Sequence, residues 1–314
     1  MDPSALNQRD LDRWILQSRP VKAEIDAYSC VAQMHEYEPL GNGTDVSCNT
    51  LFLANRECSF RCIMCDLWKQ TLNRNTPEGA IPIQINSALE MLPEADWIKL
   101  YNAGSFFDSR SVPVTDYNSI GELTASYRKI VVESHPYYIA ESCKHFSELI
   151  SGRLEVAIGL ESAIPEILNK LNKRFTVEDF RKAAERLHNW DIDMRVFIMI
   201  QPPFESPEQS LNNLLFSLKA AFDAGARICS MIPTRLGNGA MEMLHGLGYV
   251  SPPNLKLIEE ALKSALELKR GLVIVDTWDL ESTGSCVCSP LRIENIIRMN
   301  RSQQPLPLTQ CTEC

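Results

Sequence analysis

The sequence lacks long apolar stretches, an excess of basic residues and an export signal. No apolar run approaches the roughly 20 residues that a membrane-spanning helix needs. The first residues, MDPSALNQRDLDRWILQSRP, do not combine a charged segment with a following apolar one. The formal net charge is −9, which argues against a broad basic face for nucleic acid. We therefore expect a cytoplasmic protein without membrane attachment.

The sequence also lacks internal repeats, low-complexity tracts and long blocks of one charge. These absences exclude a solenoid and a long disordered tail. The chain has 314 residues, of which 45% are hydrophobic and 23% charged. This is ordinary globular composition, and the length suffices for one large domain or two smaller ones.

Cysteine, in contrast, is frequent for a cytoplasmic protein. Of the 11 cysteines, three fall within residues 58–65 and four lie close to the carboxyl end. The odd total and the clustering favour metal binding over a disulfide framework. The remaining four are expected to be ordinary buried side chains: Cys30, Cys48, Cys143 and Cys229.

Short apolar runs alternate with longer amphipathic segments. Strands are expected at 50–54, 97–101, 129–134, 154–160, 194–200 and 227–232, with a seventh at 271–277. Helical patterns fall at 85–92, 115–127, 140–150, 176–190 and 206–225, the fourth opening with the capping-box pair Thr176 and Asp179. This alternation predicts an α/β fold, a partial (β/α)6 TIM-like barrel of parallel strands. We divide the chain into a helical or irregular extension (1–47), the barrel (48–270) and a cysteine-containing C-terminal extension (271–314).

A cysteine-rich loop, NRECSFRCIMCDLW (55–68), follows the first expected strand directly. Cys58, Cys62 and Cys65 have the spacing C-x3-C-x2-C, and no fourth cysteine stands close behind. A zinc site completed by a remote ligand is one reading, but zinc sites favour C-x2-C pairs separated by a longer gap. Three thiolates on one loop suit three irons of a [4Fe-4S] cubane, whose fourth iron is left open to a small ligand.

The spacing and context of this loop resemble the radical S-adenosylmethionine (SAM) superfamily. In that family the open iron chelates the amino and carboxylate groups of SAM. An electron from the cluster then cleaves SAM, and the resulting 5′-deoxyadenosyl radical abstracts hydrogen from the substrate. The resemblance therefore implies a [4Fe-4S] cluster, SAM, and an electron donor of the flavodoxin or ferredoxin type.

Polar residues at the ends of later strands match the SAM-binding parts of this family. They occur in NAGS (102–105), VVESHP (131–136), AIGLES (157–162) and MIQPP (199–203). The resemblance implies SAM contacts from Asn102, Ala103, Gly104, Ser105, Ser134, Glu161 and Ser162. It also suggests catalytic roles for Glu161 and Gln201.

From about residue 48 onward the chain resembles the group that contains the radical SAM domain of the Elongator catalytic subunit and the archaeosine-synthase radical SAM subunit. Substrates in that group include transfer RNA, but the net charge of −9 weakens this implication. We therefore expect radical chemistry on a small metabolite, with a tRNA-modifying enzyme as the rival. A non-catalytic iron–sulfur or zinc protein, serving assembly or electron transfer, is a further alternative.

Four cysteines near the carboxyl end form two close pairs: Cys286, Cys288, Cys311 and Cys314. Four thiolates are enough for a structural zinc ion or a second iron–sulfur cluster, and the sequence does not decide between them. The alternative is four separate free thiols. Just before the first pair, Asp276, Asp279 and Glu281 are expected either to bind substrate at the barrel mouth or to solvate a strand end.

Overall fold

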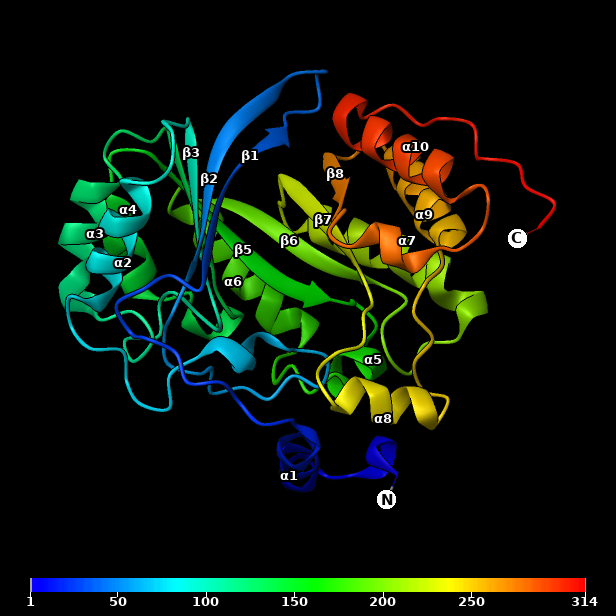
Figure 1. Cartoon of the computed structure of the whole chain (residues 1–314), viewed down its shortest axis with the longest axis horizontal. Coiled ribbons are helices and arrows are strands. Elements are labelled where there is room, and N and C mark those ends of the chain that lie inside the picture. The colour runs from blue at the N-terminus through cyan, green and yellow to red at the C-terminus, as the bar shows by residue number, and fades with distance from the viewer. Residues whose placement is uncertain (1, 314) are drawn as a thin grey trace.

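The computed structural model describes residues 2–313 and is built around one curled sheet with helices on its convex side (Figure 1). The sheet has eight strands in the order of the sequence. They are β1 (Ala32–Pro39), β2 (Asp45–Leu53), β3 (Trp97–Asn102), β4 (Lys129–Glu133), β5 (Arg153–Glu161), β6 (Asp193–Ile200), β7 (Ile228–Pro233) and β8 (Leu272–Val275). Strands β2 to β8 are parallel, and β1 pairs with β2 in the antiparallel sense. The expected partial barrel is confirmed.

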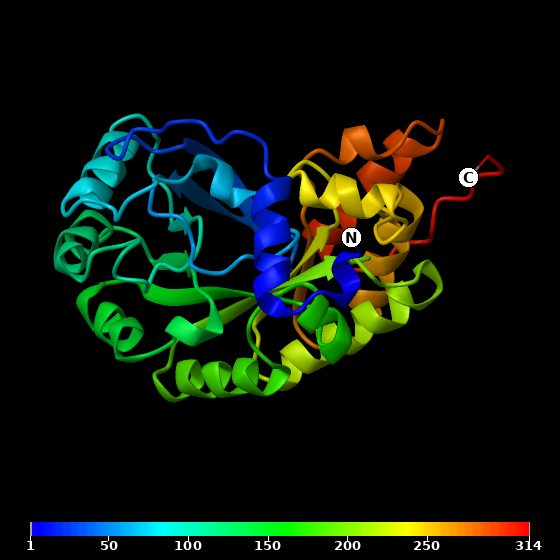
Figure 2. The same ribbon diagram turned by 90° about the horizontal axis from the view of Figure 1, so that it is seen from below.

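Most of the helices cover the outside of this half-barrel, whereas the amino-terminal helix lies across one end of it, as the view from below shows (Figure 2). The helices are α1 (Gln8–Ser18), α2 (Ala80–Leu89), α3 (Tyr117–Leu123), α4 (Glu141–Leu149), α5 (Pro165–Lys170), α6 (Val177–Asn189), α7 (Pro207–Asp223), α8 (Ala240–Gly246), α9 (Leu255–Glu267) and α10 (Ser289–Ser302). All five predicted helical segments and all seven predicted strands are present. The capping box of α6 is also confirmed: the Asp179 N–H donates to Thr176 Oγ1 at 3.1 Å, and the Thr176 N–H donates to the Asp179 carboxylate at 2.9 Å.

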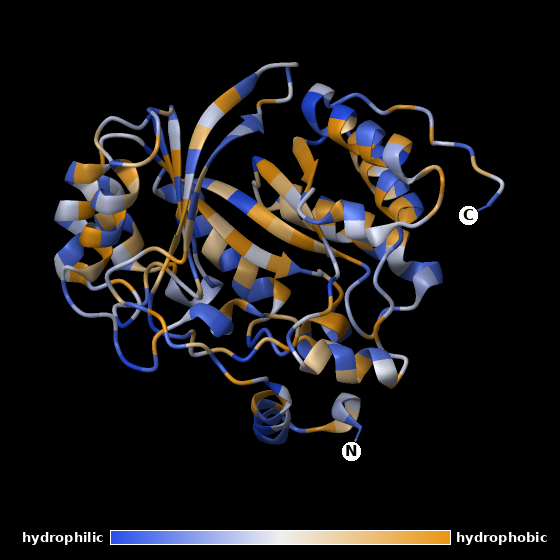
Figure 3. Ribbon diagram, viewed as in Figure 1, coloured by the Kyte–Doolittle hydropathy of each residue, from blue (hydrophilic) through white to orange (hydrophobic). Residues whose placement is uncertain are grey.

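The main hydrophobic core lies between the convex face of the sheet and the helices. In Figure 3 the central strands are coloured mostly as hydrophobic, whereas the helices show both apolar and polar residues. This is the pattern of parallel strands covered by amphipathic helices. Among residues 2–313, no helix is both long and apolar enough to cross a membrane.

Strand β1 has no counterpart in the sequence prediction, because charged residues occupy part of its inner face. Glu38 is buried and pairs with Arg195 and Lys99, and Arg195 also donates to Glu155 at 2.7 Å. These ions form a layer across the concave side of the sheet, near the amino ends of the strands. An apolar pattern is therefore absent from a strand that is nonetheless paired along its whole length.

The free edge of β8 is covered by α10 through two side-chain amides. Asn300 accepts from the Val275 N–H and donates to the Val275 carbonyl, both at 2.8 Å. Gln303 does the same for Val273, at 2.9 and 2.7 Å. The amides take the place of a further strand, which protects an edge that would otherwise expose unpaired backbone groups.

Helix α1 packs beside α8, across the end of the half-barrel at which the parallel strands finish (Figures 1 and 2). A second, smaller apolar cluster joins Leu11, Trp14 and Ile15 of α1 to Met241 of α8 and to Ile63. Ile63 belongs to the cysteine-rich loop. The amino-terminal helix therefore covers this loop at the carboxyl ends of the strands, where parallel α/β folds place their sites.

Candidate functional site

The cysteine-rich loop leaves the carboxyl end of β2 and brings Cys58, Cys62 and Cys65 to the same edge of the sheet. All three side chains are partly buried. Burial raises the pKa of the Cys58 thiol to about 11 and also raises the pKa of Cys62 and Cys65. The Phe60 N–H donates to Cys58 Sγ at 3.4 Å.

Side chains from distant parts of the sequence fix the backbone of this loop. Asn172 donates to the Arg61 carbonyl at 2.7 Å, and the Ile63 N–H donates to the Leu171 carbonyl at 3.1 Å. Asn238 donates to the carbonyls of Ile63 at 2.8 Å and Cys65 at 3.1 Å. Neither asparagine is predictable from the sequence, because a single amide in a connecting segment carries no pattern. Together they hold the cysteines in place from two sides.

The NAGS turn after β3 lies directly against the first cysteine. Gly104 has φ +133°, and a Cβ added there would lie 3.1 Å from Cys58 Cβ and 3.5 Å from its sulfur. Asn55 fixes the turn, because its amide accepts from the Ala103 N–H at 3.1 Å and donates to the Ala103 carbonyl at 3.3 Å. Glycine at 104 thus lets two loops approach closely.

Asn102, at the end of β3, has a buried amide group without a hydrogen-bond partner among the described residues. Both its Oδ1 and Nδ2 atoms are enclosed, and the residue is 4% exposed. Buried polar groups are nearly always paired, so this unpaired amide, at the end of the strand that leads into the NAGS turn, indicates a missing partner. Ser105 is buried too, but its hydroxyl already accepts from the His135 N–H at 2.8 Å.

Strand β5 ends in a charged pair that faces the cysteine loop. Glu161 has φ +64° and bonds to the buried ammonium of Lys173 at 3.0 Å. A Cβ on Gly159 would lie 2.4 Å from Glu161 Oε1, so a side chain at this position would displace the carboxylate. Lys173 also acts electrostatically on Cys62 and Cys65. Lys173 is not predictable from the sequence, since one lysine in LNKRF has no distinctive spacing.

Glu133, at the end of β4, shares this environment. Burial, with a further contribution from the Glu161 charge, raises the pKa of Glu133 to about 8, and Lys173 opposes the change. Of two neighbouring carboxyl groups at this edge, one is therefore paired with an ammonium and the other favours its neutral form.

Three other predicted residues are already engaged in the protein's own hydrogen bonds. Ser134 donates to the His135 carbonyl at 3.2 Å, and the Ser162 hydroxyl accepts from the Ile164 N–H at 3.2 Å. Gln201, with φ +57°, donates to the Ser251 carbonyl at 2.6 Å. Positive φ at both Glu161 and Gln201 is sparsely populated backbone of the kind that gathers at functional sites.

The residues at this edge fit an iron–sulfur cluster better than a single metal ion. One tetrahedral zinc ion with Zn–S bonds of about 2.3 Å holds its sulfurs about 3.8 Å apart. Among residues 2–313, three sulfurs gather within 4.8 Å only at the C-terminal cysteines, so those of Cys58, Cys62 and Cys65 are more widely spread. Three thiols, the unpaired Asn102 amide and the glycine at 104 suit a larger cofactor with a bound organic ligand.

The sequence matches no model of a protein family. It is 26% identical to an uncharacterized protein of Methanocaldococcus jannaschii, over 95% of this chain and 87% of that protein. It is 27% identical to archaeosine synthase subunit beta of Methanosarcina acetivorans, over 72% of this chain and 69% of the relative.

Two solved structures share the fold. Elp3 of the archaeon Methanocaldococcus infernus superposes with a TM-score of 0.52 and 18% identity, covering 69% of this chain and 59% of Elp3. Methylornithine synthase superposes with a TM-score of 0.55 and 13% identity, and the match covers 83% of this chain and 74% of the synthase chain. Both are radical SAM enzymes. This chain resembles radical SAM enzymes. At these identities the structural likeness concerns the fold alone.

The C-terminal cysteines form a second group of thiols. Cys286 Sγ lies 3.5 Å from Cys311 Sγ and 3.4 Å from Cys288 Sγ, close to the spacing around one tetrahedral ion. The Arg292 guanidinium donates to Cys288 Sγ at 3.3 Å and pairs with buried Glu259. Three of the four predicted ligands are therefore together, and Cys314 lies outside the described residues.

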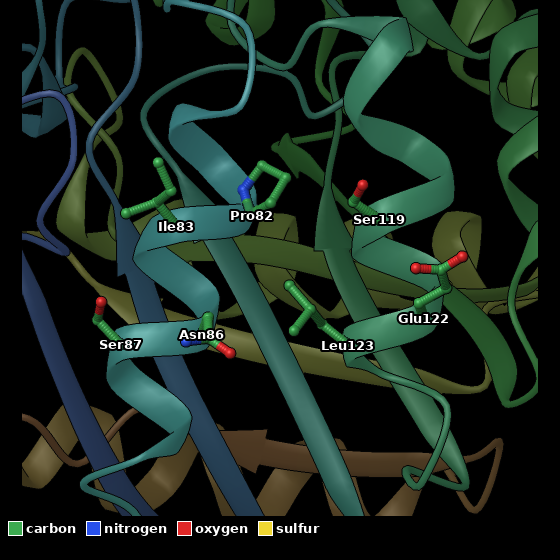
Figure 4. Close-up of a pocket in the computed structure, with 7 residues that line it drawn as sticks. All are labelled: Pro82, Ile83, Asn86, Ser87, Ser119, Glu122 and Leu123. Carbon is green, nitrogen blue, oxygen red and sulfur yellow. The ribbon is translucent and has the colours of Figure 1, made fainter.

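A shallow pocket on the outer surface lies apart from the candidate site at the carboxyl ends of the strands. Figure 4 shows its lining side chains, which come from α2 and α3: Pro82, Ile83, Asn86, Ser87, Ser119, Glu122 and Leu123. None of them belongs to the predicted site. At the end of β8, Asp276 forms an ion pair with Arg235 at 2.9 Å, and Trp278 is exposed.

Proposed function

We propose that this protein is a radical SAM enzyme whose cluster is held by Cys58, Cys62 and Cys65. When bound, a [4Fe-4S] cluster supplies one electron that cleaves SAM to methionine and a 5′-deoxyadenosyl radical. The observation that carries the proposal is the packing of the C-x3-C-x2-C loop on Gly104, two residues after Asn102 with its unpaired amide.

The protein's own residues would bind and orient SAM at this edge. The Asn102 amide, which has both a donor and an acceptor to offer, would hydrogen-bond the polar end of SAM. Glu161 is held by Lys173 in a fixed position from which its second carboxylate oxygen would accept a hydrogen bond. Helix α1 and its apolar contacts would keep water from the cysteine loop. Gln201 and Ser134 remain predicted contacts that require their present partners to move.

A small metabolite is the substrate that we propose. The ring of Tyr101 contacts two other aromatic rings. Its centroid lies 6.1 Å from that of Phe52 and 6.4 Å from that of Phe197. Tyr101 and Phe197 lie on β3 and β6, which are separated by two strands, so their rings meet across the concave side of the sheet. These partly exposed rings would form an apolar floor below the cysteine loop.

A tRNA-modifying enzyme is the second candidate, and the match to archaeosine synthase subunit beta favours it. The formal net charge of −9 opposes it, because RNA binding depends on the neutralisation of phosphates. A gel-shift titration with transfer RNA at rising salt would distinguish the two. Binding that weakens steeply with salt would support the RNA substrate, and no binding at low salt would exclude it.

At the carboxyl end we propose one structural zinc ion on Cys286, Cys288, Cys311 and Cys314. The short sulfur–sulfur distances support a single ion rather than a second cluster. We also propose that the chain divides at about residues 47 and 270. A flavodoxin or ferredoxin is the proposed electron donor, and the cytoplasm is the proposed location.

Production of 5′-deoxyadenosine tests the proposed activity. The protein is reconstituted with iron and sulfide under anaerobic conditions, reduced with dithionite and incubated with SAM. Wild type should release 5′-deoxyadenosine, and Cys62→Ala should release none. Cys143→Ala is the matched control, because Cys143 is fully buried in α4 and far from the loop in sequence. A wild-type protein that carries a cluster but never cleaves SAM would refute the proposal.

A further inference from the structure

Lys173 is a buried cation that faces the cysteine loop. It lies in the connection between α5 and α6 and is only 7% exposed. Its ammonium group is 3.0 Å from Glu161 Oε1. Electrostatic interactions link it to Cys62, Cys65 and Cys58. A lysine is rarely buried to this degree unless it is paired. Its ion pair with Glu161 explains its burial, but not its position against the cysteine loop, to which Leu171 and Asn172 are hydrogen-bonded.

The backbone around Lys173 is fixed by the same loop. The Leu171 carbonyl accepts from the Ile63 N–H, and the Asn172 amide bonds to Arg61 and to Asp12. The Lys173 carbonyl bonds to His135 Nε2 at 2.8 Å. Phe60 of the loop stacks on the His135 ring, with 3.7 Å between centroids. The ammonium group is therefore placed by a rigid frame that includes the cysteine loop itself.

We infer that Lys173 is a positioning residue that raises the reduction potential of the cluster held by Cys58, Cys62 and Cys65. The inference rests on the proposed function. On reduction the cluster gains one electron and one negative charge, and no bond forms or breaks. A buried ammonium stabilises the more negative state, and its effect is large because little water screens it. Glu161 offsets part of this effect, so the pair sets the potential by the balance of its two charges.

The test is a redox titration of reconstituted protein without SAM, with dithionite as reductant, followed by electron paramagnetic resonance. Lys173→Met removes the cation with little change in volume, and Glu161→Gln removes the anion. We expect Lys173→Met to lower the reduction equilibrium constant at least tenfold, which is about 59 mV for one electron. Glu161→Gln should shift the potential in the opposite direction, and the double variant should lie between the two. Lys173→Arg, which keeps the charge, is the control and should stay close to wild type.

A merely structural role for Lys173 would not give shifts of opposite sign. If Lys173→Met and Glu161→Gln both leave the potential unchanged, or shift it in the same direction, the inference is wrong. Where Lys173→Met fails to take up iron, Glu161→Gln decides alone, and an unchanged or lower potential in it overturns the inference. A wild-type protein that forms no cluster would instead overturn the proposed function, which keeps the two failures distinct.

Discussion

Replacement of Gly104 by alanine tests the contact between the NAGS turn and the cysteine loop. The backbone at φ +133° is strained for any residue with a Cβ, at a cost of about 1–3 kcal/mol. For a chain of this size that corresponds to a fall in Tm of about 2–6 °C. In addition, the new methyl group would lie 3.1 Å from Cys58 Cβ and 3.3 Å from its Cα, so the first cysteine must move. Backbone strain alone has no such effect on the cysteine.

The assay compares iron content per chain and Tm for Gly104→Ala and Gly225→Ala. Gly225 also has positive φ, +96°, but no atom lies within 4 Å of its added Cβ. Both variants should lose stability to a similar extent, and only Gly104→Ala should lose most of its cluster iron. Equal iron content in the two variants would show that the close approach at Cys58 does not matter for cluster binding.

Two further predictions concern other parts of the molecule. Cys311→Ser should remove about one zinc per chain while the iron content stays at the wild-type level, as elemental analysis would show; loss of several irons instead would indicate a second cluster. Burial raises the pKa of Glu133 to about 8, so the folded state binds this proton more tightly than the unfolded chain does. The contribution of Glu133 to stability therefore falls as the pH rises from about 4.5 to about 8. In urea unfolding, Glu133→Gln should be more stable than wild type at pH 8.5 and nearly equal to it at pH 5; a stability difference that does not vary with pH would contradict this assignment.

The fold was largely predictable from the sequence, because its seven parallel strands are buried on the helix side and read as apolar runs. Strand β1 was not, since its inner face carries Glu36 and Glu38, which are matched by Lys99 and Arg195 from strands far along the chain. A sequence shows each charge but not its partner. The interior of the half-barrel is therefore the part of the fold that required the structure.

The candidate site divides in the same way. The cysteine spacing predicted the loop, and its place after a strand predicted the edge of the sheet where it lies. Lys173, Asn172 and Asn238 were not predictable, because each acts through one side chain held by tertiary contacts. The structure also separates predicted residues that look equivalent in sequence: Asn102 has an unpaired amide, whereas Ser134, Ser162 and Gln201 bond to the protein itself.

The central claim is that three cysteines hold a four-iron cluster and leave one iron open to SAM. Mössbauer spectroscopy of ⁵⁷Fe-reconstituted wild-type protein, recorded before and after the addition of SAM, tests it most directly. SAM should change the signal of one iron in four and leave the other three as they were. Four irons that are all unaffected by SAM would contradict it.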